Sequence, residues 1–248
     1  MSKVISISNH KGGVGKTTTA LNIGAGLQQM GKSVLLIDLD PQANLSQSLR
    51  IDNQERNIYG SLKGKYALEP VTIRPGISVV PSTLDLSGAE IELAGEPGRE
   101  YILKELIDPL RSAYDYIIID SPPSLGLLTI NAFTASDQII IPVQAEFLAL
   151  QGLTKLTEVI DKIRSRLNKG LTIAGILITQ YDNRKVLNRD VVTSITGRYK
   201  ELVFNTKIRD NVALAEAPTQ GLDIFSYSPK SNGAEDYLAL CVEYSHKY

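Results

Sequence analysis

The 248-residue sequence is poor in several features that mark specialised classes of protein. It has one cysteine, Cys241, and no tryptophan. A single cysteine cannot form a disulfide within the chain, nor supply the two thiolates per subunit that a shared iron–sulfur cluster requires. No apolar run approaches the roughly 20 residues of a membrane-spanning helix. The first residues enter a strand pattern almost at once and leave no room for a signal peptide, so we expect a cytoplasmic protein.

The chain also lacks a strong charge of either sign. Its net charge is −1, so no overall basic excess indicates nucleic acid, and any DNA contact must come from local clustering. Hydrophobic residues make up 43% and charged residues 21%, as in an ordinary soluble globule. With no internal repeat, low-complexity tract or linker, the sequence predicts one α/β domain over residues 1–248.

What the sequence does have is a glycine-rich stretch at residues 9–18, Asn-His-Lys-Gly-Gly-Val-Gly-Lys-Thr-Thr. An apolar strand pattern precedes it and a helical pattern follows, which is the context of a phosphate-binding loop. Glycines let the backbone approach a polyphosphate closely, and the helix N-terminus adds its positive dipole end. Lys16 would reach the β- and γ-phosphates, and the Thr17 hydroxyl would bind Mg²⁺.

Two later strand patterns end in carboxylates. Val34-Leu35-Leu36-Ile37 runs into Asp38-Leu39-Asp40-Pro41-Gln42, and Tyr116-Ile117-Ile118-Ile119 runs into Asp120-Ser121-Pro122-Pro123. Ligands bind beyond the carboxyl ends of the strands in open α/β sheets. An aspartate that ends an apolar strand can reach a bound Mg²⁺, usually through water. Together with the glycine-rich loop, these carboxylates predict a phosphoryl-transfer site.

The loop departs from the strict G-x-x-x-x-G-K-S/T pattern, because His10 stands where the first glycine would be and Lys11 adds a second lysine. The form K-G-G-V-G-K-T-T resembles the deviant Walker A signature of the ParA/Soj/MinD ATPase family. The D-x-D-P-Q and D-x-P-P segments are similar to that family as well. The resemblance covers nearly the full length, and we interpret His10 as structural.

The resemblance implies a role for each of these residues. Lys11 would cross a dimer interface to the phosphates of the partner subunit, and Asp40 would orient the attacking water. Asp38, Asp120 and Thr17 would form the Mg²⁺ shell, and a segment near Arg209 and Asn211 would lie beside the adenine. The predicted ATP-binding residues are Lys11, Gly12, Gly13, Val14, Gly15, Lys16, Thr17, Thr18, Arg209 and Asn211, and the predicted catalytic residues are Asp40, Lys11 and Lys16.

The rest of the chain alternates strand and helix patterns, which predicts a three-layer, doubly wound, mostly parallel sheet. The expected strands are 77–81, 138–143, 172–179 and 202–204. The expected helices are 99–112, 151–167, 188–200 and 233–244, and residues 60–64 are expected to form a turn.

A local excess of basic residues lies between Arg184 and Arg209, with seven basic against two acidic residues, or 7 − 2 = +5. Arg189 and Lys200 are eleven residues apart and would share one face of a helix. Such a face could contact DNA phosphates without reading bases. In the resembled proteins this part of the chain binds DNA nonspecifically when two subunits have bound ATP. The predicted DNA-binding residues are Lys185, Arg189, Arg198, Lys200, Lys207 and Lys230.

The sequence thus predicts a ParA/Soj-type ATPase switch for DNA segregation, nucleoid-associated, slow on its own and stimulated by a ParB-like centromere-binding protein. A MinD-like positioning ATPase is an alternative, but it would need a basic amphipathic C-terminal helix. The last residues are too short and insufficiently basic for one. A metabolic ligase with a phosphate-binding loop is a second alternative, although such an enzyme has no need of Lys11.

Overall fold

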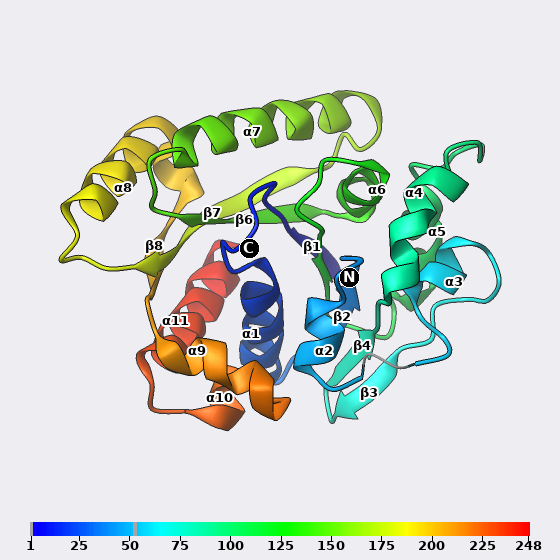
Figure 1. Cartoon of the computed structure of the whole chain (residues 1–248), viewed down its shortest axis with the longest axis horizontal. Helices are drawn as coiled ribbons and strands as arrows, with labels where there is room; N and C mark the ends of the chain where they lie inside the picture. Colours follow the sequence, from blue (N-terminus) through cyan, green and yellow to red (C-terminus); the bar gives the residue numbers. More distant parts are fainter. Residues whose placement is uncertain (1, 52–53) are drawn as a thin grey trace.

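The computed structural model describes residues 2–51 and 54–248 (Figure 1). The centre of the fold is an eight-stranded sheet with the strand order β3-β4-β2-β5-β1-β6-β7-β8. All neighbouring strands are parallel except the edge pair β3 and β4. The strands are β1 Lys3–Ile7, β2 Val34–Asp38, β3 Val71–Arg74, β4 Ile77–Val80, β5 Tyr116–Asp120, β6 Gln138–Gln144, β7 Thr172–Tyr181 and β8 Val203–Arg209. The predicted doubly wound α/β fold is therefore confirmed.

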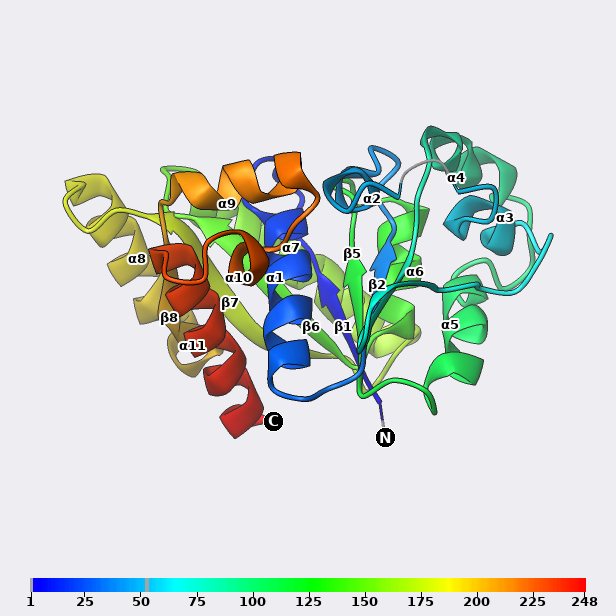
Figure 2. The ribbon, with the colours of Figure 1, turned by 90° about the horizontal axis from the view of Figure 1, so that it is seen from below.

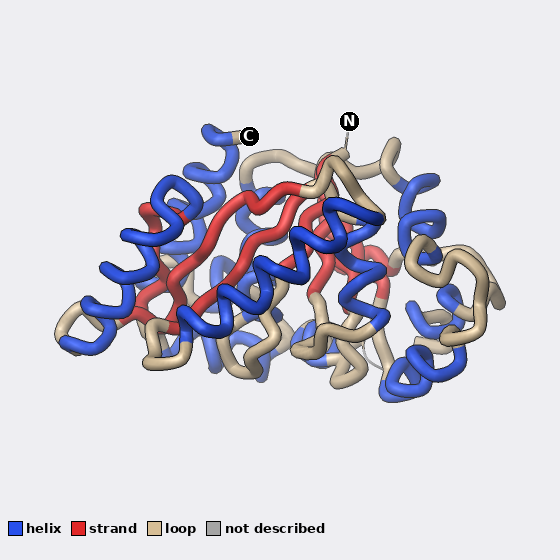
Figure 3. Tube along the Cα trace, turned by 90° about the horizontal axis from the view of Figure 1, so that it is seen from above, coloured by secondary structure: helices blue, strands red, loops and turns tan. Residues whose placement is uncertain are grey.

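Helices lie on both faces of this sheet, and Figure 3 shows them crossing the strands. The α-helices are α1 Lys16–Gln29, α2 Asn44–Ser48, α3 Ile58–Leu62, α4 Ala89–Glu92, α5 Ile102–Ile107, α6 Leu127–Ala135, α7 Ala149–Arg166, α8 Val186–Tyr199, α9 Val212–Glu216, α10 Ile224–Tyr227 and α11 Asn232–Lys247. Short 3₁₀ helices are η1 Leu84–Gly88, η2 Asp108–Leu110, η3 Lys200–Leu202 and η4 Ala217–Gln220. No helix of the described residues is long and apolar enough to cross a membrane.

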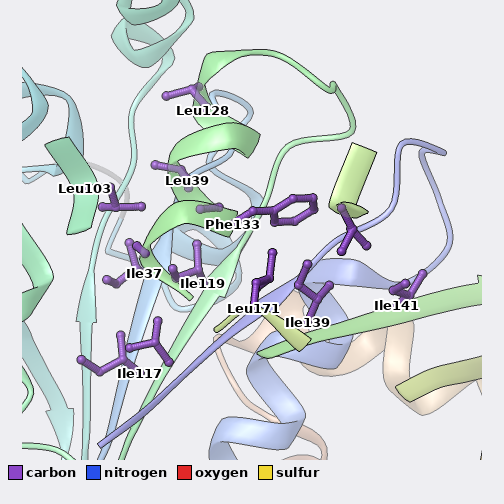
Figure 4. Packing of buried hydrophobic residues seen from close by; sticks show 14 of the residues in the cluster. Ile37, Leu39, Leu103, Ile117, Ile119, Leu128, Phe133, Ile139, Ile141 and Leu171 are labelled. Carbon is purple, nitrogen blue, oxygen red and sulfur yellow. The ribbon is translucent and has the colours of Figure 1, made fainter. Parts of the chain in front are cut away.

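The central strands are hydrophobic on both faces, and alternate residues feed two separate cores. In β5, Ile117 and Ile119 pack with the helices α5, α6 and α7, whereas Ile118 packs with α1 and α11. Figure 4 shows the first core, in which Phe133 of α6 lies among aliphatic side chains such as Ile119 and Ile139. The sheet is held from both sides, which keeps the carboxyl ends of its strands in fixed positions.

Helix α1 packs very closely on its neighbours because it contains glycines. A Cβ on Gly24 would lie 2.7 Å from Leu36 Cδ2 of β2. A Cβ on Gly26 would lie 2.6 Å from the Sγ of Cys241 in α11. The close approach fixes the C-terminal half of α1 against β2 and α11.

Several sequence-based boundaries need correction. The expected helix over 99–112 is only α5, followed by the 3₁₀ turn η2, because Pro109 lacks the N–H that an α-helix needs there. The expected turn at 60–64 is partly α3, which the Asn57 side chain caps by accepting from Gly60 N. The expected strand over 202–204 extends to Arg209 as β8.

Candidate active site

The glycine-rich loop connects β1 to α1 at the carboxyl edge of the sheet (Figure 2). Gly13 and Gly15 have φ angles of +76° and +85°, in the left-handed region that favours glycine. No side chain caps the first turn of α1, and no acidic residue lies in it. The free N–H groups and the positive dipole end of α1 are therefore available to an anion.

Lys16 at the start of α1 is buried, and its Nζ donates to the backbone carbonyl of Lys11 at 3.1 Å. Burial lowers the pKa of Lys16, while Asp120 and Asp40 act in the opposite direction. The ammonium group is thus held inside the curve of the loop with two carboxylates near it. A phosphate group is the kind of partner that such a lysine binds.

Asp120 ends β5, and the register places it directly opposite Asp38 of β2. Its side chain is fully buried, and neither carboxylate oxygen has a hydrogen bond of normal geometry. Burial, followed by the nearby Asp38, raises the pKa of Asp120 well above its ordinary value, although the Thr17 hydroxyl opposes this. A buried carboxylate without a partner suits a divalent cation, since such a group is costly to leave unpaired.

Asp38 has its hydrogen bonds already made. Its Oδ2 accepts from the Ser46 backbone N–H at 2.8 Å and from the Ser46 hydroxyl at 2.7 Å, and its Oδ1 accepts from the Asp40 N–H at 3.2 Å. Burial raises the pKa of Asp38 to about 6 even so. These three hydrogen bonds hold residues 38–46 together. The part of Asp38 in a metal shell stays a prediction.

Two serines extend this network to Asp40. The Ser82 N–H, just beyond β4, donates to the Ser46 hydroxyl at 2.9 Å, and the Ser82 hydroxyl donates to the Asp40 carbonyl at 2.8 Å. Asp40 Oδ1 accepts from the Gln42 N–H at 3.0 Å. The Asp40 backbone is therefore fixed by contacts from two strands.

A cavity of about 400 Å³ lies between the loop, residues 40–48 and the segment after α9. Seven of the predicted residues line it: Gly12, Gly13, Gly15, Lys16, Thr17, Thr18 and Asp40. Arg209 and Asn211 line a neighbouring cavity of about 280 Å³ that shares Gly15 and Thr18. Val14, in the same loop, has a buried side chain and lines neither cavity. The structure thus places eight of the ten predicted nucleotide-binding residues around two adjoining cavities, with Val14 and Lys11 as the exceptions.

Lys11 does not line either cavity. Its ammonium group forms an ion pair with Glu146 in the loop after β6, and both side chains are about half exposed. Both residues line a separate cavity of about 680 Å³ that also includes the exposed side chains of Phe147 and Leu148. His10 packs against Gly152 of α7, and burial, followed by Lys155, lowers the pKa of His10.

Arg209 and Asn211 already have partners within the subunit. Arg209 forms ion pairs with Asp236 and Glu235, which raise the pKa of its guanidinium. The Asn211 side chain caps α9 by accepting from Ala213 N at 2.9 Å. Their contact with a nucleotide stays a prediction.

The predicted DNA-binding residues are spread over several elements. The helical-face argument for Arg189 and Lys200 is wrong, because α8 ends at Tyr199 and Lys200 has a left-handed backbone, with φ +46°. Five of the six side chains are exposed, namely Lys185, Arg189, Arg198, Lys200 and Lys230. Lys207 is half-buried, with its Nζ 5.4 Å from the centre of the Tyr181 ring.

Sequence reasoning missed four polar residues that brace the site: Ser46, Ser82, Thr179 and Gln180. The last three lie at the carboxyl ends of β4 and β7. A polar residue at the end of a parallel strand was the available signal, but which partner it meets depends on the order of strands in the sheet.

No cluster of three or more His, Cys, Asp or Glu side chains that could hold a metal ion by itself occurs in residues 2–51 and 54–248. The Asp120 carboxylate beside the Thr17 hydroxyl fits Mg²⁺, which binds through one or two protein groups, water and phosphate oxygens. The residues present therefore fit a magnesium–polyphosphate complex.

Comparisons with known proteins agree with this geometry. A family model described as an AAA domain matches residues 2–173. The chromosome partitioning protein ParA of Myxococcus xanthus is 46% identical over 244 residues, which are 96% of this chain and 86% of that protein. The sporulation initiation inhibitor protein Soj of Bacillus subtilis is 45% identical over 248 residues, 98% of each chain.

Among solved structures, the chain resembles a cobyrinic acid a,c-diamide synthase from Mycobacterium smegmatis with bound ADP and magnesium. The TM-score is 0.86 and the sequence identity 36%, over 98% of this chain and 93% of that one. The likeness therefore extends over nearly the full length of both chains.

Proposed function

The chain belongs to the ParA/Soj family of partition ATPases, and from this premise we propose that it is an ATP-dependent dimerising switch for DNA segregation. The enzyme is an ATPase, and its cofactors are ATP and Mg²⁺. The observation that carries the proposal is Lys11. This second lysine lies in the phosphate-binding loop but outside the cavity of its own subunit.

The groups that would bind the phosphates of ATP lie in the loop and in the first turn of α1. The N–H groups of the loop and the Lys16 ammonium contact the phosphates, which replaces the bond from Lys16 to the Lys11 carbonyl. Thr17 and Asp120 would hold Mg²⁺, which when bound neutralises charge on the β- and γ-phosphate oxygens. Pairing with the cation would then relieve the cost of the buried, unpartnered Asp120 carboxylate.

Hydrolysis requires a group that orients the attacking water, and Asp40 is the candidate in the cavity. Its Oδ1 is engaged by the Gln42 N–H, so Oδ2 is the oxygen left to accept a hydrogen bond from water. The Asp40 N–H donates to Asp38 and the Asp40 carbonyl accepts from Ser82, while the Gln42 N–H donates to the Asp40 carboxylate. The carboxylate is therefore already held in place before ATP binds. Such preorganisation is what positions a water for in-line attack.

Dimerisation would couple the site to DNA. ATP bound to one subunit supplies phosphate oxygens for Lys11 of a second subunit, so the triphosphate favours the paired state, and loss of the γ-phosphate removes that contact. Pairing brings two sets of exposed basic side chains onto one assembly. Because affinity for DNA phosphates rises with the number of cations that contact them, the dimer binds nonspecific double-stranded DNA more tightly than one subunit does. A ParB-like protein would then stimulate hydrolysis and release the complex from the nucleoid.

The test compares DNA binding by wild type and Lys11→Ala with ATP, with ADP and without nucleotide. We expect wild type to dimerise and retain DNA only with ATP, and Lys11→Ala to bind ATP but to remain single and release DNA. Lys32→Ala is the matched control, since Lys32 is an exposed lysine between the C-terminal end of α1 and the start of β2. Wild type that stays monomeric with ATP in light scattering, or Lys11→Ala that dimerises normally, would contradict the proposal.

Two other outcomes would point to different functions. ATP-dependent sedimentation with liposomes would indicate a MinD-like positioning ATPase, but the apolar side of α11 is occupied in the core, where Tyr237, Leu240 and Tyr244 are buried. Turnover that depends on a small carboxylate acceptor and ignores DNA would indicate a metabolic ligase. We expect neither.

A further inference from the structure

Two consecutive residues at the end of β7 contact two consecutive carbonyls of the phosphate-binding loop. The Thr179 hydroxyl donates to the Val14 carbonyl at 2.9 Å, and the Gln180 Nε2 donates to the Gly13 carbonyl at 2.7 Å. No other strand end reaches the middle of the loop with two side chains in the described part of the protein. The loop is thus hydrogen-bonded to a strand that lies 165 residues further along the chain.

The backbone geometry gives these two bonds a consequence for phosphate binding. In a planar trans peptide the C=O and N–H groups point in opposite directions. The Gly13 carbonyl shares its peptide with the Val14 N–H, and the Val14 carbonyl shares its peptide with the Gly15 N–H. Holding both carbonyls toward β7 therefore turns the N–H groups of Val14 and Gly15 away from β7.

Gln180 adopts an unusual conformation to make its contact. Its φ is +50°, in the left-handed region that few side chains other than glycine and asparagine occupy. Strained backbone of this kind is kept where the surrounding structure requires it, and it gathers at functional sites. The side chain also lines the 400 Å³ cavity beside Gly13 and Gly15.

The orientation of the Gln180 amide is set by its two partners. The Gly13 carbonyl can only accept, so it must face Nε2 of Gln180. The Gln180 Oε1 then accepts from Gln144 Nε2 of β6 at 2.9 Å. A chain of hydrogen bonds therefore runs from the end of β6 through the end of β7 into the loop.

We propose that Thr179 and Gln180 are positioning residues, which preset the Val14 and Gly15 peptides so that their N–H groups face the phosphates of ATP, and that Gln144 fixes the Gln180 amide for this purpose. The proposal rests on the nucleotide-binding site described above. It accounts for the strained Gln180 backbone, and for the fact that one hydroxyl donor and one amide donor from β7 both bind this loop. Preset N–H groups bind an anion without the cost of ordering the loop.

The first test is Gln180→Gly, because glycine relaxes the left-handed backbone and should leave folding intact. We expect an unchanged or higher melting temperature without nucleotide, together with a dissociation constant for Mg·ATP raised about five- to tenfold, the size of one lost hydrogen bond. Gln180→Glu keeps the shape but removes the donor, and should weaken binding further. Thr179→Val should weaken it severalfold.

A second readout separates positioning from a general loss of structure. Inorganic tripolyphosphate added to ¹⁵N-labelled wild type should shift the amide signals of Val14 and Gly15 strongly, and those shifts should shrink in Gln180→Gly. Gln28→Ala is the matched control, since Gln28 donates to the Pro75 carbonyl at the other end of α1. It should change neither readout.

Each outcome decides a specific point. Wild type that binds no Mg·ATP would refute the ATPase site itself. If Gln180→Gly and Thr179→Val both bind Mg·ATP as tightly as wild type, or both show the wild-type amide shifts, this inference is refuted. The ATPase assignment would then remain in place.

Discussion

Replacement of Asp120 by asparagine should make the nucleotide-free protein more stable while it removes the response to magnesium. Asp120 is fully buried, has no hydrogen bond of normal geometry and lies opposite Asp38. Leaving a buried polar group without a partner costs about 1–3 kcal/mol, and more when the group is charged, so a neutral side chain of the same shape should relieve a cost of about this size. For a chain of this size, about 2–3 kcal/mol corresponds to roughly 4–12 °C in melting temperature.

The sign of the pH dependence makes this prediction sharper. The pKa of Asp120 is raised in the folded state, so its ionisation opposes folding as the pH rises above the unfolded value of about 4. The penalty is absent below that value and grows toward the folded pKa. The advantage of Asp120→Asn should therefore be small at pH 4.5 and large at pH 7.5.

Urea unfolding at pH 4.5, 6.0 and 7.5, with and without Mg·ATP, measures both effects. Wild type should gain stability from Mg·ATP by mass action, about 2.7 kcal/mol at a ligand concentration 100 times its dissociation constant. Asp120→Asn should gain much less, so the order of stability reverses when Mg·ATP is added. Asp115→Asn is the control, because Asp115 immediately precedes the same strand. Hydrogen bonds from Ser33 lower the pKa of Asp115, so this change should destabilise the protein. Asp120→Asn that is less stable without nucleotide, or equally favourable at every pH, would refute the reasoning.

Three further changes test the site and the fold. Asp40→Ala should bind ATP, dimerise and stay on DNA while hydrolysis falls about 100-fold or more, measured by phosphate release; normal turnover would show that this aspartate is misassigned. Lys16→Ala should abolish ATP binding in calorimetry, and retained affinity would contradict its role. Gly26→Ala should lose about 1–3 kcal/mol in urea unfolding through the clash with Cys241 Sγ, and the double change with Cys241→Ala should recover most of it. A double variant as unstable as the single one would place the strain elsewhere.

Much of the fold could be predicted from the sequence because its strands are apolar on both faces and end at recognisable signals. The glycine-rich loop, Asp38 and Asp120 each follow a run of aliphatic residues, and the sheet brings these runs together. Glycine or aspartate at one strand end is also typical of an ordinary turn, so the prediction is strong because the loop and the two carboxylates occur together in one chain.

What the sequence could not predict depends on contacts between distant segments. Lys200 continues the pattern of α8, yet its backbone is left-handed and the helix stops before it. The short helices α2, α9 and α10 have only four or five residues each, too few for a periodic pattern. Ser82 and Gln180 have no local signature, because their roles exist only once β4 and β7 take their places in the sheet.

On the proposed mechanism, Lys11 has to leave its ion pair with Glu146 before it can contact a second subunit. A pair that is about half exposed contributes at most about 1 kcal/mol, because water screens it and both side chains keep much of their freedom. Exchanging that carboxylate for the triphosphate of a neighbour therefore gives up little. On the proposed mechanism, the supply of loaded subunits, rather than a barrier inside each one, determines when pairs form.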